Sequence, residues 1–86
     1  MSGVSGRKIA FLATDGVEAR ELTEPWDALR NAGAEVHLIS LRAGEIQGVE
    51  KDLPTKRFTV DRTIDQARAG DYDGLVLPGG VANPDR

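Results

Sequence analysis

The sequence predicts a small α/β domain built on a parallel sheet. The first observation is an apolar run over residues 8–13 that shows no alternation, as in strands that are buried on both faces. The second is a stretch over residues 17–32 with apolar side chains at helical spacing, followed by another strand-like run over residues 35–41. A strand, a helix and a strand in this order predict two parallel strands joined by a right-handed crossover.

Length and composition limit the chain to one soluble, folded domain. It has 86 residues and a mass of 9.2 kDa, with 40% hydrophobic and 29% charged residues, which is ordinary globular usage. The longest apolar run, residues 9–13, is too short to span a membrane, and residues 1–8 lack the apolar core of a secretory signal. We therefore expect a cytoplasmic protein without a membrane partner.

Residue types that are absent or rare exclude several kinds of site. The chain has no cysteine, and therefore no disulfide, thiolate metal site or thiol nucleophile of its own. Its one histidine, His37, stands in a predicted strand, where we expect a packed residue rather than a ligand or base. A net charge of -3 without a basic block argues against a nucleic-acid partner. We expect no metal and no cofactor.

The predicted helix over residues 17–32 has one irregular position and a clear end. Its apolar face is formed by Leu22, Trp26 and Leu29. Pro25 lacks the backbone N–H of a regular helical residue, so either the helix starts near Glu24 or its first turn is bent. Gly33 ends the helix as a left-handed cap.

The rest of the chain predicts shorter elements. Residues 42–56 are polar and broken by glycine and proline, which favours a short hairpin or an excursion before the sheet resumes. A brief strand over residues 57–60 and a short helical segment over residues 63–69 are expected next. Residues 74–77 form a third buried strand that runs into Pro78.

A new helix is predicted to begin at the end of the chain. Asn83 is a favourable N-cap, Pro84 suits the first helical position, and Asp85 favours the positive end of the helix dipole. Three strands and one full helix would leave one face of a parallel sheet uncovered. We therefore interpret the chain as the amino-terminal fragment of a larger domain, with the remainder of that domain as its partner. The alternative is a complete minidomain with a frayed tail.

Ligands of open α/β sheets bind beyond the carboxyl ends of the strands, which directs attention to residues 14–21 and 78–83. No glycine-rich phosphate motif follows the first strand, so nucleotide binding is not expected. Glu18 and Glu21 lie one helical turn apart at the helix start, where acids stabilise the helix dipole. Alternatively, one of them points into the cleft and shares a proton with a nucleophile. Glu21 is the better candidate because it adjoins the buried face, and we expect Glu18 to be exposed.

Two glycines directly follow the third buried strand. Gly79 and Gly80 allow backbone N–H groups to approach a ligand without side-chain hindrance, as in an oxyanion site. A tight turn in which glycine only supplies a positive φ explains the same pattern. Both interpretations stay open on these residues alone.

Three segments together resemble the DJ-1/PfpI superfamily, and within it the PfpI-like intracellular protease branch. They read E-L-T-E-P-W-D-A-L over residues 21–29, A-G-A-E-V over residues 32–36, and D-Y-D-G-L-V-L-P-G-G over residues 71–80 with N-P-D at 83–85. The resemblance covers the chain after Gly6. It implies a flavodoxin-like parallel sheet sandwich, related to class I glutamine amidotransferase domains, of which residues 1–86 are the amino-terminal half.

The resemblance also implies a role for three residues. Glu21 matches the buried acid that hydrogen-bonds the family's nucleophilic cysteine, and Gly80 matches the glycine whose N–H faces the oxyanion. Asp85 matches an acid that reaches across a subunit interface to a neighbour's catalytic histidine. The family's Cys-His pair has no counterpart in this chain, so these residues alone are not expected to catalyse.

Functions of two classes follow from the resemblance. The first is part of a cytoplasmic, homo-oligomeric, cysteine-dependent hydrolase of the PfpI type with a stress role, acting on peptides or on aldehyde-modified small molecules and proteins. The alternative is a non-catalytic oxidative-stress sensor or chaperone-like member of the same fold. A flavodoxin-like receiver or nucleotide-binding module would need a pair of acids directly after the first strand, and only Asp15 stands there.

Overall fold

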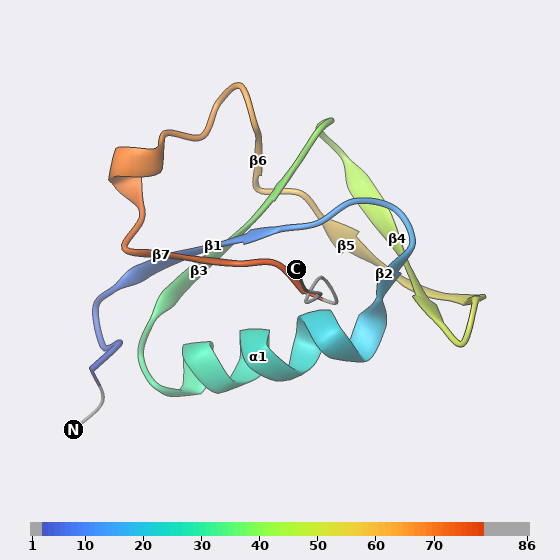
Figure 1. Cartoon of the computed structure of the whole chain (residues 1–86), viewed down its shortest axis with the longest axis horizontal. Coiled ribbons are helices and arrows are strands. Elements are labelled where there is room, and N and C mark those ends of the chain that lie inside the picture. Colours follow the sequence, from blue (N-terminus) through green and yellow to red (C-terminus); the bar gives the residue numbers. More distant parts are fainter. Residues whose placement is uncertain (1–2, 79–86) are drawn as a thin grey trace, which may run out of the picture.

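The chain folds around a four-stranded parallel sheet, shown in Figure 1, in a computed structural model that describes residues 3–78. The strands lie in the order β6-β3-β1-β7, and each neighbouring pair is parallel. Their bounds are β1 (Lys8–Leu12), β3 (Glu35–Ser40), β6 (Arg62–Thr63) and β7 (Gly74–Val76). The predicted α/β class and the parallel pairing of the first two long strands are confirmed.

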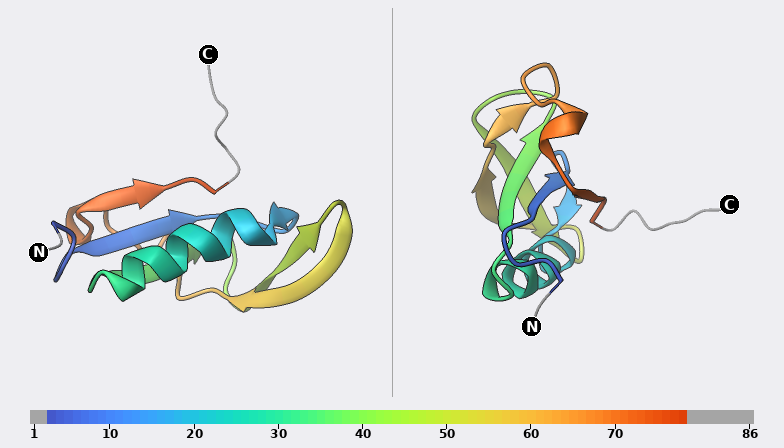
Figure 2. Two further views of the ribbon diagram at one scale, coloured as in Figure 1. Left: turned by 90° about the horizontal axis from the view of Figure 1, so that it is seen from below. Right: turned by 90° about the vertical axis from the view of Figure 1, so that its left-hand side faces the viewer.

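One helix, α1 (Ala19–Asn31), covers one face of this sheet (Figure 2). The core lies between the two layers, where the side chains of Phe11, Leu22 and Leu38 are at most 1% exposed. Trp26 of α1 closes this core against Phe11. The apolar spacing that predicted the helix therefore also identified the face that packs on the sheet.

The two ends of α1 exclude one of the alternatives for its start and show how it terminates. The helix begins at Ala19 and continues through Pro25, so a start near Glu24 is wrong. At its other end Gly33 adopts a φ of 98° and donates its N–H to the carbonyl of Arg30, 3.0 Å away. The N–H of Ala34 reaches back to the Leu29 carbonyl at 3.0 Å, which completes a Schellman motif and confirms the predicted cap.

A second sheet of three strands lies beside the first, in the order β2-β4-β5. Its bounds are β2 (Val17–Glu18), β4 (Glu45–Glu50) and β5 (Leu53–Thr59). Residues 17 and 18 were expected in the helix, but their backbone instead pairs with Gly48 and Val49 of β4. The turn between β4 and β5 places Lys51 and Asp52 at positive φ, as a two-residue type I′ turn requires. Because β5 begins directly after this turn, it is longer than the brief strand expected over residues 57–60.

The short helix expected over residues 63–69 does not form. The N–H of Ile64 instead donates to the Ser40 carbonyl at 2.9 Å, which extends the pairing of β6 with β3. The N–H of Thr63 is taken by the side chain of Gln66 at 3.0 Å. The N–H groups of Gln66 and Ala67 close a single turn onto the Thr63 carbonyl, both at 3.0 Å, and a 3-10 turn, η1 (Ala69–Asp71), follows.

The second face of the parallel sheet has no α-helix over it in the part of the chain that the structure describes (Figure 2). Leu75 is 61% exposed on β7 and Ile64 is 45% exposed beside it, around an open pocket of about 380 Å³. This pocket also contacts Ala10, Leu12, Ile39 and Tyr72. The expectation that three strands and one helix leave a face uncovered holds for residues 3–78.

Candidate functional site

The order of the strands places the candidate site at one edge of the sheet. The chain passes from β1 through α1 to β3 on one side of β1, and later returns to β7 on its other side. Phe11 of β1 pairs with Val76 of β7, so the two strands end at the same edge (Figure 1). This reversal beside β1 is the topological switch point where open α/β sheets bind ligands. The segments that follow β1 and β7 are therefore the ones that the sequence had indicated.

The loop that follows β1 is held by the hairpin of the second sheet. The carboxylate of Asp15 accepts the backbone N–H of Gln47 at 2.7 Å, and the N–H of Gly16 donates to the Gln47 carbonyl at 2.8 Å. Gly16 has a φ of 91°, which favours glycine and lets the chain turn from β1 into β2. The entry to α1 is thus fixed by contacts from a distant segment.

The two acids at the helix start differ in their surroundings, and in the opposite sense to the expectation. Glu18, the residue before α1, is half-buried, and its carboxylate accepts the Lys51 N–H at 3.4 Å. Glu21, in the first turn of α1, is exposed. Glu18 is covered because its backbone pairs with Val49 in β4, which brings the hairpin turn over it.

Glu21 is the acid left available at this edge. Within residues 3–78 it makes no hydrogen bond or ion pair, whereas Glu24 one turn later pairs with Arg20 at 3.1 Å. Gly80 and Asp85, the other two residues assigned by resemblance, lie outside the described residues. The structure therefore places one of the three and shows that its carboxylate has no partner in the same part of the chain.

A pocket of about 340 Å³ lies at the carboxyl ends of β1 and β3, beside the hairpin. Its wall is largely polar, with an ion pair between Arg57 and Glu45 at 3.4 Å across the two strands of the hairpin. The other lining residues include Thr14, Asp15, Leu41 and Arg42. The hairpin thus forms one wall of the surface next to the candidate site.

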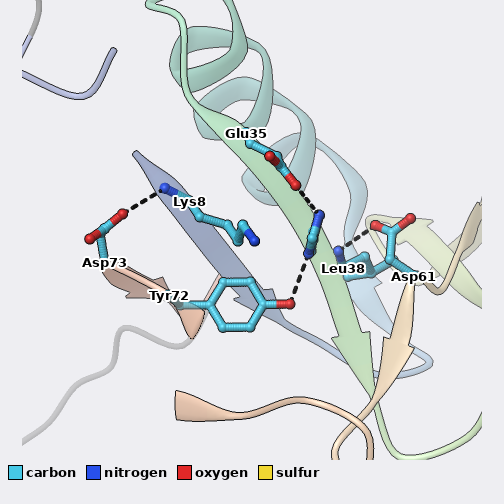
Figure 3. Close-up of polar contacts among 7 residues, drawn as sticks. Lys8, Glu35, Leu38, Asp61, Tyr72 and Asp73 are labelled. Carbon is cyan, nitrogen blue, oxygen red and sulfur yellow. Dashed lines mark hydrogen bonds and ion pairs between the residues drawn. The ribbon is translucent and has the colours of Figure 1, made fainter. Parts of the chain in front are cut away.

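His37 lies elsewhere and is a packed residue, as expected. Its ring nitrogens lie 2.8 Å from the Tyr72 hydroxyl and 2.7 Å from the carboxylate of Glu35 (Figure 3). Glu35 is the first residue of β3, so this group is at the opposite edge of the sheet from the candidate site. Nowhere in residues 3–78 do three side chains that could ligate a metal come together.

Comparison with known proteins identifies the family. The model of the DJ-1/PfpI family matches residues 7–86. The chain belongs to the DJ-1/PfpI family. The strands lie in the order β3-β1-β7, and α1 connects β1 to β3 along the chain. This arrangement agrees with the flavodoxin-like fold that the resemblance implied.

Three similar proteins support this assignment. Protein/nucleic acid deglycase 2 of Escherichia coli is 40% identical over 86% of this chain and 42% of its own length. General stress protein 18 of Bacillus subtilis is 38% identical over 94% of this chain and 45% of its own length. The crystal structure of a two-domain protein from Anabaena variabilis, with DJ-1/ThiJ/PfpI-like and ferritin-like domains, has a TM-score of 0.73 and 34% identity over 88% of this chain and 21% of that chain. The DJ-1/PfpI chain described here thus spans less than half of the length of each of these proteins.

Sequence reasoning missed the contribution of the hairpin to this site. Gln47 contacts the loop after β1 through both its N–H and its carbonyl, whereas the sequence predicted a hairpin in this stretch without any contact to that loop. The glycine that follows it, Gly48, was the one local signal of a close approach between two segments of the chain. Among residues 3–78, no helix combines the length and apolarity needed to span a membrane.

Proposed function

We propose that this chain is the amino-terminal part of a cytoplasmic cysteine-dependent hydrolase of the PfpI type. The observation that carries the proposal is Glu21, an exposed carboxylate without a partner in residues 3–78, at the switch-point edge of a DJ-1/PfpI fold. The cysteine comes from the remainder of the domain, because this chain contains none. The histidine comes from there too, because His37 is packed at the opposite edge of the sheet. That remainder also covers the open face of the sheet.

Each assigned residue has a distinct task in this proposal. Glu21 hydrogen-bonds the cysteine and shares a proton with it, since two bare anions in contact would repel each other. The N–H of Gly80 stabilises the oxyanion that forms when the thiolate attacks a carbonyl or an aldehyde adduct. Asp85 reaches the histidine of a neighbouring subunit and holds its orientation, as the third member of a triad does.

The substrates proposed are aldehyde-modified amines of small molecules and proteins, with peptides as the second class. A relative that covers most of this chain is named a deglycase, which supports the first class. The test is an assay of the complete protein on arginine and lysine derivatives modified by methylglyoxal, beside an assay on a chromogenic peptide. Release of the free amine supports the proposal if treatment with iodoacetamide abolishes that release. Absence of turnover on both substrates contradicts it.

A non-catalytic role in stress is the second candidate, because another relative over nearly the whole chain is named a general stress protein. In that case the fold and Glu21 serve to tune the oxidation of the cysteine. A cysteine that is oxidised by hydrogen peroxide in a protein without turnover favours this second candidate.

A further inference from the structure

Gln47 joins three segments through its backbone N–H, its backbone carbonyl and its side-chain Nε2. Its backbone N–H and carbonyl contact Asp15 and Gly16, at 2.7 Å and 2.8 Å, in the loop that leads to α1. Its side-chain Nε2 donates to the carbonyls of Gly48 and Thr55, both at 2.8 Å. Because an amide has two N–H groups, both donors are satisfied.

The side chain of Gln47 is needed because the hairpin ladder is irregular at this point. The pairing of β4 with β5 shifts register between Gln47 and Val49. Gly48 lies in the gap and is buried against the ring of Phe58, where a Cβ atom would lie only 2.6 Å from a ring carbon. The Gln47 amide therefore crosses this irregularity and binds Thr55 of the edge strand.

We propose that Gln47 is a positioning residue of the candidate site. Its side chain holds β5 to β4, and its backbone holds the Asp15–Gly16 loop in the place from which α1 starts. The pairing of Val17 with Gly48 continues this contact up to the residue before the helix. The position of Glu21 in the first turn of α1 is thus set by the hairpin. The inference rests on the proposed function, which gives Glu21 its role as the acid beside the cysteine. It adds that Gln47 orients this acid.

Two matched substitutions separate this role from a general effect of charge. Q47E keeps the shape of the side chain but turns a carboxylate oxygen towards two carbonyl oxygens, which removes both hydrogen bonds. Q66E makes the same change at the other glutamine of the chain, whose Oε1 only accepts the Thr63 N–H at 3.0 Å, a bond that a carboxylate retains. Q47M removes the donors without adding charge and replaces Q47E if that variant does not fold.

The experiment measures amide hydrogen exchange and turnover in the complete protein. In Q47E we expect the amides of Gly16 and Gln47 to exchange about tenfold faster or more, and those of Q66E to be unchanged. The protection should return in part at low pH, where the variant carboxyl group regains one O–H donor. Turnover should fall through kcat with KM unchanged, because the acid is displaced while substrate binding is retained.

The two ways of failing are distinguishable. Equal exchange of the Gly16 and Gln47 amides in Q47E and in the unchanged protein overturns the inference, whether or not the protein is an enzyme. Faster exchange with an unchanged kcat also overturns it, because the hairpin then does not position the acid. Absence of turnover in the unchanged protein is instead the failure of the proposed function.

Discussion

Phe11 of β1 and Trp26 of α1 pack with their ring centroids 5.0 Å apart and their planes at 58°. Phe11 is fully buried, and Trp26 is half-buried on the helix face that covers it. This contact fixes the position of α1 on the sheet. It therefore contributes, together with the hairpin contacts at the helix start, to the depth at which Glu21 meets the edge of the sheet.

The first prediction concerns this contact. F11A should lower the free energy of unfolding of the complete protein by about 3–5 kcal/mol, because it removes a large buried ring and leaves a cavity. F11L fills more of that space and should lose clearly less. Urea unfolding of the three proteins measures both effects, and an equal loss in F11A and F11L would show that the ring does not pack as described.

The second prediction concerns the open face of the sheet. Leu75 on β7 and Leu53 on the hairpin are similarly exposed in residues 3–78, at 61% and 68%. If the remainder of the domain covers the face that carries Leu75, L75K buries an unpaired charge and should cost more than about 3 kcal/mol. L53K should stay within about 0.5 kcal/mol of the unchanged protein. Equal effects of the two substitutions on urea unfolding would mean that this face stays open.

The third prediction separates the two acids at the helix start. E21Q should reduce kcat/KM of the complete protein by about 10²–10⁴-fold, because Glu21 loses its ability to exchange a proton with the cysteine. E18Q should leave the rate nearly unchanged, since the Gln carbonyl can still accept the Lys51 N–H. Reaction with iodoacetamide over a range of pH reports the thiol pKa in each variant. Unchanged turnover and an unchanged thiol pKa in E21Q would contradict this role and leave Glu21 only the stabilisation of the helix dipole.

The fourth prediction concerns the subunit interface. D85A should lower turnover without loss of fold, because the histidine of a neighbouring subunit loses its orienting acid. Mixing D85A subunits with subunits that lack the nucleophile should restore part of the activity, since some interfaces then join an intact acid to an intact cysteine. Inactive mixtures despite proven subunit exchange, or a fully active monomer, would exclude the cross-subunit role.

Local signals predicted much of the fold. The uninterrupted apolar run before Ala13 indicated a strand buried on both faces, and Gly33 indicated the left-handed cap, because each depends on a few neighbouring residues. The hairpin of the second sheet was expected near its observed place, but β2 and its pairing with β4 could not be predicted in this way. β2 has only two residues, and it is a strand because β4, far along the chain, offers it backbone partners.

The candidate site, too, has features that local sequence patterns predicted and features that depend on distant contacts. The position of Glu21 at the helix start and of β7 before Pro78 followed from sequence patterns and from the rule for strand ends. The relative burial of Glu18 and Glu21 did not, because it depends on the contact of Glu18 with the hairpin turn at Lys51. The part played by Gln47 depends on the register shift in the hairpin, which composition does not reveal.

The central claim is that this chain supplies one part of the active site of a cysteine hydrolase. The most direct test is the intact mass of the active protein before and after treatment with iodoacetamide. We predict a polypeptide of about twice 9.2 kDa that gains one adduct on a cysteine as its activity disappears. An active, cooperatively folded protein of 9.2 kDa that takes up no adduct would contradict the claim.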